Sequence, residues 1–127
     1  MTPESANYLL KAAESLDEAR QISAIGLFKP AARAAYYTAF HAAEALIFER
    51  TGKIAKTHSG VRSEFARIGQ PDPRLDQTYF KFIADSYRFK EISDYSVDPH
   101  ATVTKAECAR LIEGAEHFLN TIVKILG

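Results

Sequence analysis

The feature that most constrains the fold is an uninterrupted run over residues 31–51, which is rich in alanine and aromatic residues. A proline precedes this run and a glycine follows it, an arrangement typical of the start and the end of a helix. Its apolar side chains recur at helical spacing in two stripes, one with Tyr36 and Phe40 and the other with Tyr37 and Phe48. Two stripes would bury most of a helix, so we expect this segment to be the central helix of a bundle.

Glycine and proline divide the rest of the chain into further helical segments. We expect helices over about 3–25, 61–68, 75–92 and 104–126, with loops at 53–60 and 93–103. Thr104 and Glu107 have the capping-box spacing at the start of the last helix. Short connections favour antiparallel neighbours. The predicted fold class is all-α, an antiparallel up-and-down bundle of four or five helices in a single domain spanning residues 1–127.

The composition is that of an ordinary globular protein, with 46% hydrophobic and 25% charged residues. Sixteen basic and sixteen acidic side chains cancel, so net charge gives no reason to expect strong non-specific binding to nucleic acid or membranes. Cys108 is the single cysteine and excludes an intrachain disulfide. There is no leader pattern and no apolar run of roughly 18–20 residues. We therefore expect a soluble, cytoplasmic protein without a membrane segment.

A polar seam on the central helix is the first candidate binding site. It consists of Arg33, Tyr37, His41 and Glu44, which recur at spacings of three and four and so share roughly one face. A polar seam among aromatic residues must satisfy its hydrogen-bonding groups. One interpretation is a structural hydrogen-bond network or an exposed edge, and the other is a cleft that binds a ligand or a partner.

A basic segment follows the central helix. Its cationic side chains are Arg50, Lys53, Lys56, Arg62 and Arg67. Glu64 is the only acid between residues 50 and 67. Such a patch beside tyrosines would suit phosphate groups, and we assign Lys56 and His58 to it as candidates. The alternative is a solvated loop in which His58 only orients a turn.

The third candidate group lies at the end of the long helix predicted over residues 75–92. Arg88, Asp94 and Tyr95 are close in sequence there. An arginine, a carboxylate and a hydroxyl at a helix end would form an ion pair with a hydrogen-bonded hydroxyl. Alternatively, the guanidinium would face a phosphate, with Asp94 or Tyr95 positioning it.

Three strings in these groups resemble one family. They are AAYYTAFHAAEAL at residues 34–46, KTHSG at residues 56–60 followed by Phe65, and RFKEISDY at residues 88–95. Together and in this order they resemble the HEPN domain family, in the branch with an HSG turn and an R…DY element. The resemblance implies a helical bundle that usually dimerises. Many members are metal-independent ribonucleases that carry an arginine, four to six further residues and then a histidine, and many pair with a minimal nucleotidyltransferase in a toxin–antitoxin system.

The sequence departs from that ribonuclease signature. Counting from Arg88, the histidine would fall at residues 93–95, where Asp94 and Tyr95 stand instead. A carboxylate lacks the near-neutral titration of imidazole and repels phosphate. His58, together with Tyr37, Arg88 and Tyr95, would have to supply the base, the acid and the charge stabilisation that cleavage needs. Arg110 and His117 have the signature spacing but lie within the last predicted helix, so we interpret that match as chance.

The resemblance therefore implies a HEPN-domain protein that acts with a nucleotidyltransferase partner in a toxin–antitoxin-like or RNA-directed defence system. RNA or a nucleotide is the expected ligand. The alternatives are a metal-independent endoribonuclease in its own right and a non-catalytic dimeric module that binds a nucleotide. The four histidines lack paired ligand spacing, so neither a metal nor a cofactor is expected. A homodimer is expected, because tyrosine-rich and phenylalanine-rich helices need a covering surface.

Overall fold

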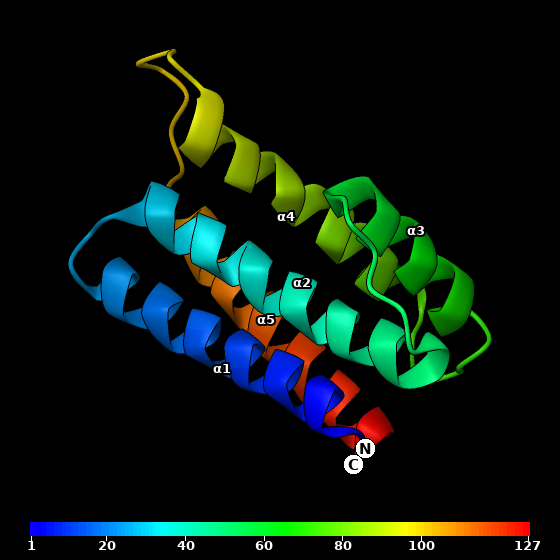
Figure 1. Ribbon diagram of the computed structural model, residues 1–127. Coiled ribbons are helices and arrows are strands. Elements are labelled where there is room, and N and C mark those ends of the chain that lie inside the picture. Colours follow the sequence, from blue (N-terminus) through cyan, green and yellow to red (C-terminus); the bar gives the residue numbers. More distant parts are fainter.

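The computed structural model describes all 127 residues as five helices joined by short loops and contains no strand (Figure 1). The helices are α1 (Pro3–Ala24), α2 (Phe28–Thr51), α3 (His58–Gly69), α4 (Gln77–Tyr95) and α5 (Lys105–Leu126). The predicted all-α fold class is confirmed. No helix combines the length and the hydropathy that a bilayer crossing requires.

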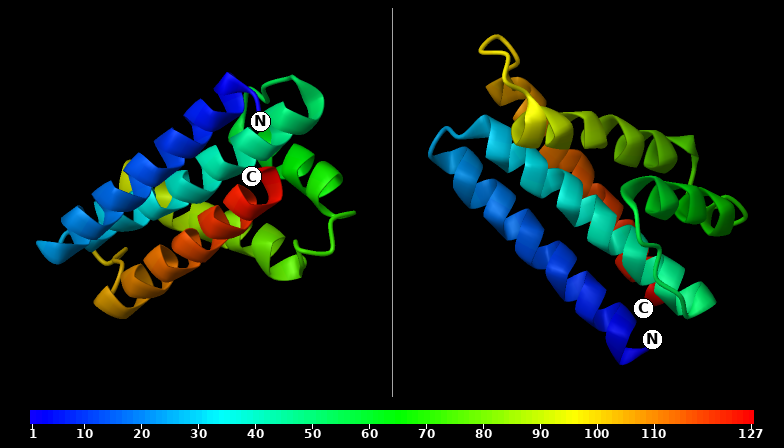
Figure 2. Two further views of the ribbon diagram at one scale, coloured as in Figure 1. Left: turned by 90° about the horizontal axis from the view of Figure 1, so that it is seen from below. Right: turned by 45° about the horizontal axis from the view of Figure 1, so that its top comes forward.

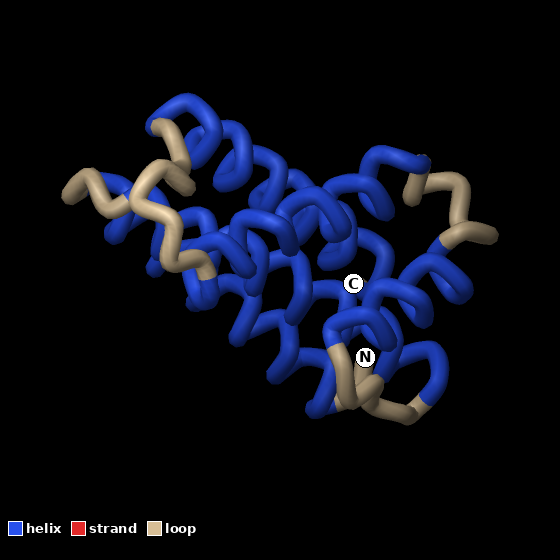
Figure 3. Tube along the Cα trace, turned by 90° about the horizontal axis from the view of Figure 1, so that it is seen from above, coloured by secondary structure: helices blue, strands red, loops and turns tan.

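Helix α2 is the centre of the bundle and packs against each of the other four helices. Helix α1 runs antiparallel along one side of α2, while the short α3 and the long α4 lie on the other side (Figures 1 and 2). Helix α5 packs behind α2, and the two chain termini lie together at one end (Figure 2). The α1–α2 and α4–α5 loops lie at the opposite end (Figure 3).

Alanine explains how α2 accommodates so many neighbours. Seven of its alanines are completely buried, at positions 31, 32, 35, 39, 42, 43 and 45. Methyl side chains let the flanking helix backbones approach closely, and the fully buried Tyr36 is the large exception among them. The central position predicted from the two stripes follows directly from this composition.

Glu49 fastens the beginning of α1 to the end of α2. Its carboxylate accepts hydrogen bonds from the Thr2 backbone nitrogen at 3.0 Å and from the Ser5 hydroxyl at 2.9 Å. The pKa of Glu49 is lowered chiefly by the Thr2 backbone hydrogen bond and then by Ser5. Thr2 also caps α1 by accepting from the Ser5 backbone nitrogen. This end of the antiparallel helix pair is thus held in register.

Two of the differences from the expected helix boundaries affect the candidate residues. Helix α3 begins at His58 instead of Val61, because the Thr57 side chain caps it by accepting from the Gly60 backbone nitrogen at 2.9 Å. Helix α4 continues to Tyr95, whereas a loop was expected after residue 92. His58, Asp94 and Tyr95 are consequently held by helical backbone.

The starts of α2 and α4 differ as well, since Pro30 was expected to open α2 and Leu75 to open α4. Helix α2 begins at Phe28, with Pro30 inside its first turn, where a proline removes no hydrogen bond. Helix α4 begins at Gln77 after the N-cap Asp76, and Leu75 is buried just before it. The capping box expected at the start of α5 is present in both directions.

Candidate functional site

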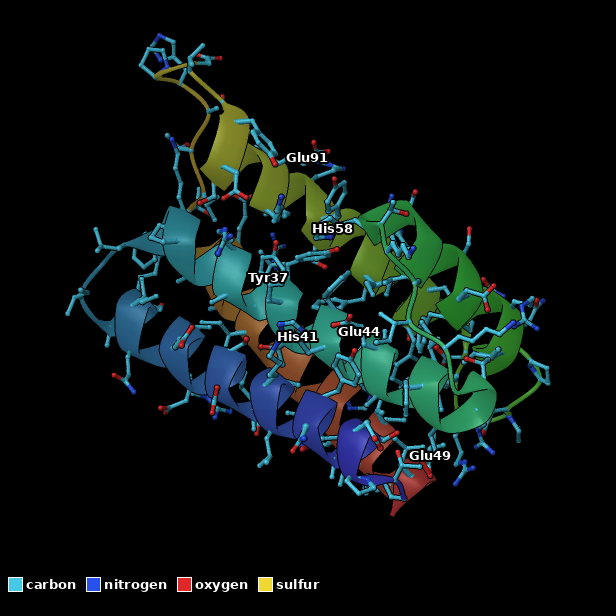
Figure 4. The ribbon with its side chains drawn as sticks, in the orientation of Figure 1. Tyr37, His41, Glu44, Glu49, His58 and Glu91 are labelled. Carbon is cyan, nitrogen blue, oxygen red and sulfur yellow. The ribbon has the colours of Figure 1, made fainter.

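Side chains from α2, α3 and α4 meet in one cluster, which we call the tyrosine–cation cluster. Its members are Arg33, Tyr36 and Tyr37 on α2, His58 and Arg62 on α3, and Tyr87, Lys90, Asp94 and Tyr95 on α4. Figure 4 labels Tyr37 and His58 on the side of α2 that faces α4. The cluster therefore depends on three helices that are distant in sequence.

His58 is at the centre of the cluster because it is the first residue of α3. Its Nδ1 atom lies 2.7 Å from the hydroxyl oxygen of the buried Tyr36. Its ring lies among aromatic rings, with centroid distances of 4.8 Å to Phe40 and 5.2 Å to Tyr87. The imidazole is thereby fixed in position by one hydrogen bond and by packing.

The surroundings of His58 favour its neutral form. Burial lowers its pKa below the usual 6.5, and the positive charges of Lys90 and Arg62 lower it further. Burial also raises the pKa of Tyr36, so this phenol keeps its proton at neutral pH and is able to donate to Nδ1. A neutral imidazole beside two cations is the result.

Lys90 is the most deeply buried charge of the cluster, with 4% of the residue exposed. Its ammonium lies 3.0 Å from Asp94 Oδ2 and 3.4 Å from the Tyr95 hydroxyl. The same nitrogen lies 4.8 Å from the centre of the Tyr95 ring and 5.8 Å from that of Tyr87. Burial lowers the pKa of Lys90, but the hydrogen bonds to Asp94 and Tyr95 outweigh it, so the pKa is raised and Lys90 remains charged.

Asp94 joins α4 to the beginning of α2. Its Oδ1 atom accepts from Arg33 Nε at 2.6 Å, while Oδ2 faces Lys90. Burial raises the pKa of Asp94, but the hydrogen bonds from Lys90 and Arg33 outweigh this and hold it below its usual range. A single ionised carboxylate thus lies between two cations.

Arg62 adds a third cation that has no carboxylate partner. Its guanidinium carbon lies 4.4 Å from the centre of the Tyr87 ring. The Arg62 Nη1 atom is buried and makes no hydrogen bond. Arg33 similarly lies 4.8 Å from the centre of the Tyr37 ring. The cluster therefore contains three cations, one carboxylate and four tyrosines, and it carries an excess of positive charge.

The structure brings together five of the nine residues predicted as site candidates: Arg33, Tyr37, His58, Asp94 and Tyr95. His41 and Glu44 form their own pair within α2, with 2.7 Å between Nδ1 and Oε1, and the His41 ring adjoins Tyr37. His41 and Glu44 thus continue the polar seam of α2 beyond Tyr37, on the side away from the cations of the cluster.

Arg88 and Lys56 lie outside the cluster. Arg88 is exposed, and in an ideal helix it is about 200° around the axis from Lys90. Its charge acts instead on Glu107, at the beginning of α5. Lys56 is exposed in the loop before α3. Arg110 is also exposed, and His117 bonds Tyr79 between α5 and α4, with 2.9 Å between Nε2 and the hydroxyl oxygen.

Four residues of the cluster were not predicted as site residues from the sequence: Tyr36, Arg62, Tyr87 and Lys90. Tyr36 was assigned to the core stripe and Arg62 only to the basic segment as a whole. A signal for Lys90 was present, since residues 79, 83, 86 and 90 are the buried positions of α4 and share one helical face. A lysine in a buried stripe needs a partner, and Asp94 follows it by one turn.

The cluster has the components of a site for a polyanion with aromatic groups. Arginine and lysine bind phosphate oxygens, and tyrosine rings stack on bases. The Tyr95 hydroxyl beside Lys90 and the imidazole of His58 add hydrogen-bonding groups, while the completely buried Tyr36 hydroxyl holds that imidazole in place.

Comparison with known proteins identifies the family of this chain. The profile of the HEPN domain matches residues 5–126. Two proteins of Methanocaldococcus jannaschii, MJ0605 and MJ0142, are each named as a putative toxin. MJ0605 is 30% identical over 91% of this chain and 83% of its own length. MJ0142 is 28% identical over 91% of this chain and 77% of its own length. The protein glr0978 of Gloeobacter violaceus is 30% identical over 94% of this chain and 98% of its own length.

A solved structure has the same fold. The crystal structure of TT1696 from Thermus thermophilus superposes with a TM-score of 0.81 and covers 97% of this chain and 98% of its own. The sequence identity is 19%, so the likeness concerns the fold alone.

Proposed function

Because the chain belongs to the HEPN domain family, we propose that it is the toxin-like member of a toxin–antitoxin pair and that it binds RNA through the tyrosine–cation cluster. The relatives named as toxins support the first part. The observation that carries the second part is the cluster itself, in which Arg33, Arg62 and Lys90 outnumber Asp94 among tyrosine rings.

The binding of RNA can be tested with charge-removing variants. Fluorescence anisotropy with a labelled single-stranded oligoribonucleotide would compare the wild type with Arg33→Met and Lys90→Met. We expect each variant to bind about tenfold more weakly, as for the loss of one charged hydrogen bond. Arg88→Met is the matched control, because it removes an exposed cation of the same chain outside the cluster. Equal losses in all three variants would contradict a role for the cluster.

The proposed partner is a minimal nucleotidyltransferase, as the family resemblance implies. Co-purification of the tagged chain with the product of a neighbouring gene tests this directly. Recovery of a nucleotidyltransferase in a stable complex is the expected result. The absence of such a gene nearby, together with no partner on pull-down, would contradict it.

RNA cleavage is a second candidate function, favoured by the state of His58. In the tautomer whose Nδ1–H donates to the Tyr36 hydroxyl oxygen, the neutral imidazole has its Nε2 free as a base, and Lys90 and Arg62 would stabilise a phosphorane-like transition state. A cleavage assay in EDTA should then lose activity in His58→Ala. Arg88→Ala tests the arginine that the family motif would assign. Activity unchanged in both variants would contradict these assignments.

A homodimer is also part of the proposal. Large apolar side chains are exposed at the loop end of the bundle, with Val97 98% exposed and Ile25 72% exposed. A second copy of the chain would cover such groups. Light scattering at tens of micromolar should give a dimer mass, and a purely monomeric mass would contradict this.

A further inference from the structure

The carboxylate of Asp94 occupies the position that best suits a bound phosphate. It lies between Arg33 Nε at 2.6 Å and Lys90 Nζ at 3.0 Å, with one oxygen toward each cation. A phosphodiester presents two anionic oxygens in the same way, and arginine and lysine bind both groups by the same charged hydrogen bonds. The protein therefore already holds an anion of its own at this point.

The two ends of this contact differ in accessibility. Lys90 is buried, whereas the Arg33 side chain is 44% exposed and that of Asp94 is 20% exposed. A ligand can therefore approach from the side of Arg33. Asp94 is the penultimate residue of α4, and the exposed segment from Ser96 to His100 follows it, so solvent is close to the carboxylate.

Tyr95 adds a surface for a base next to this point. The residue is 68% exposed, and its ring lies 4.8 Å from the Lys90 ammonium. Exposed aromatic rings beside a cation are the usual platform for an unpaired base, which has a free face for stacking. A double helix offers no such face, so the arrangement suits single-stranded RNA.

We propose that Asp94 is an internal substitute for a ligand phosphate, and that single-stranded RNA binds by displacing this carboxylate from Arg33 and Lys90 while a base stacks on Tyr95. This inference rests on the proposed binding of RNA by the cluster. Asp94 thereby sets the affinity of the site, because any incoming phosphate must compete with it.

The test is the affinity of Asp94→Asn for a labelled single-stranded oligoribonucleotide at fixed salt. We expect this variant to bind about tenfold more tightly than the wild type, since a competing charge is removed while the shape is kept. Glu91→Gln is the matched control, because Glu91 is an exposed acid on the same helix and makes no ion pair (Figure 4). It removes the same charge and should change the affinity less than about twofold.

A different result would overturn the inference. If Asp94 only fastens α4 to α2, Asp94→Asn would bind RNA equally or more weakly. A third outcome separates the two proposals. In it the wild type binds RNA and Arg33→Met binds more weakly, but Asp94→Asn binds no more tightly than the wild type. The role of Asp94 as an internal competitor is then contradicted, while the proposed function stands. If neither the wild type nor Asp94→Asn binds RNA, the proposed function itself fails.

A measurement on the wild type makes the test independent of the folding of a variant. Carbon-13 NMR of the Asp94 carboxyl would follow its pKa with and without saturating RNA. Displacement from Arg33 and Lys90 should raise this pKa toward the usual 3.8 or above. A pKa that stays lowered in the complex would show that the carboxylate remains in place, contrary to the inference.

Discussion

Lys90 shows how a single buried charge organises the site. The residue occupies a position of α4 that otherwise carries the side chains of the core, as Ile83 does two turns earlier. An ammonium can remain there because Asp94 and Tyr95 accept hydrogen bonds from it and because it makes cation–π contacts with the Tyr87 and Tyr95 rings. The lysine in turn adds to the effect of burial in lowering the pKa of His58, so the charge of one residue favours the neutral form of another.

The pKa of His58 can be measured by NMR titration of its imidazole protons. We expect a midpoint below 6.5, set first by burial and then by the charges of Lys90 and Arg62. Lys90→Met and Arg62→Met should each raise it. A midpoint at or above 6.5 in the wild type would contradict the arrangement described for the cluster.

The lowered pKa of His58 also determines the sign of a pH effect on stability. Between the lowered value and 6.5 the unfolded chain binds a proton that the folded chain does not. The contribution of neutral His58 to stability is therefore complete above pH 6.5 and is lost as the pH falls through this range. Urea unfolding should show this loss in the wild type, and His58→Gln should lack it.

The residues that the sequence could identify are those within one helix. The seam Arg33–Tyr37 and the pair Lys90–Asp94 each follow from spacings of four residues. The meeting of His58 with Tyr36 and Tyr87 depends on how three helices pack, and no local spacing encodes that distance. Arg88 illustrates the opposite error, because nearness in sequence to Asp94 does not place it on the same face of α4.

At the scale of the helix, the position of His58 depends on how α3 begins. HSG at residues 58–60 was expected to be a turn, since glycine and serine are common in loops. Instead Thr57 provides the N-cap, and the helix starts three residues earlier than predicted. The end of α4 was missed for a related reason: no glycine or proline occurs between residues 93 and 98, so no residue there requires the helix to stop.

Two N-cap threonines allow a matched test of this dependence. Thr57→Ala and Thr104→Ala each remove a side-chain cap, of α3 and α5 respectively, and each should lower the free energy of unfolding by about 1 kcal/mol. Only Thr57→Ala should also weaken RNA binding, because it loosens the turn that carries His58. Urea unfolding and anisotropy measure the two effects. Equal RNA affinities in the two variants would contradict the role of the α3 cap.

At the scale of the whole molecule, the alanines of α2 set the distances between the helices. Ala39 is completely buried, whereas Ala13 on α1 is exposed. We expect Ala39→Leu to lower the free energy of unfolding by about 1–3 kcal/mol through overpacking. Ala13→Leu is the control and should stay within about 0.5 kcal/mol of the wild type. Similar values for the two variants in urea unfolding would contradict the close packing around α2.

The net charge of zero makes the salt dependence of RNA binding informative. Because no global excess of charge attracts RNA, the dependence should come from the cations of the cluster. One phosphate shared by Arg33 and Lys90 and a second at Arg62 predict a slope of about −1.4 for the logarithm of the association constant against the logarithm of the salt concentration. Arg33→Met should reduce this slope, and Arg88→Met should leave it unchanged. A slope near zero would exclude binding through these cations.

The chain contains six tyrosines and no tryptophan. Four of those tyrosines, at positions 36, 37, 87 and 95, belong to the cluster. A base stacked on Tyr95 would quench the emission of that ring, with no tryptophan present to mask the change. The molecule thus carries its own optical reporter, which allows ligands to be screened without a label and without altering a residue.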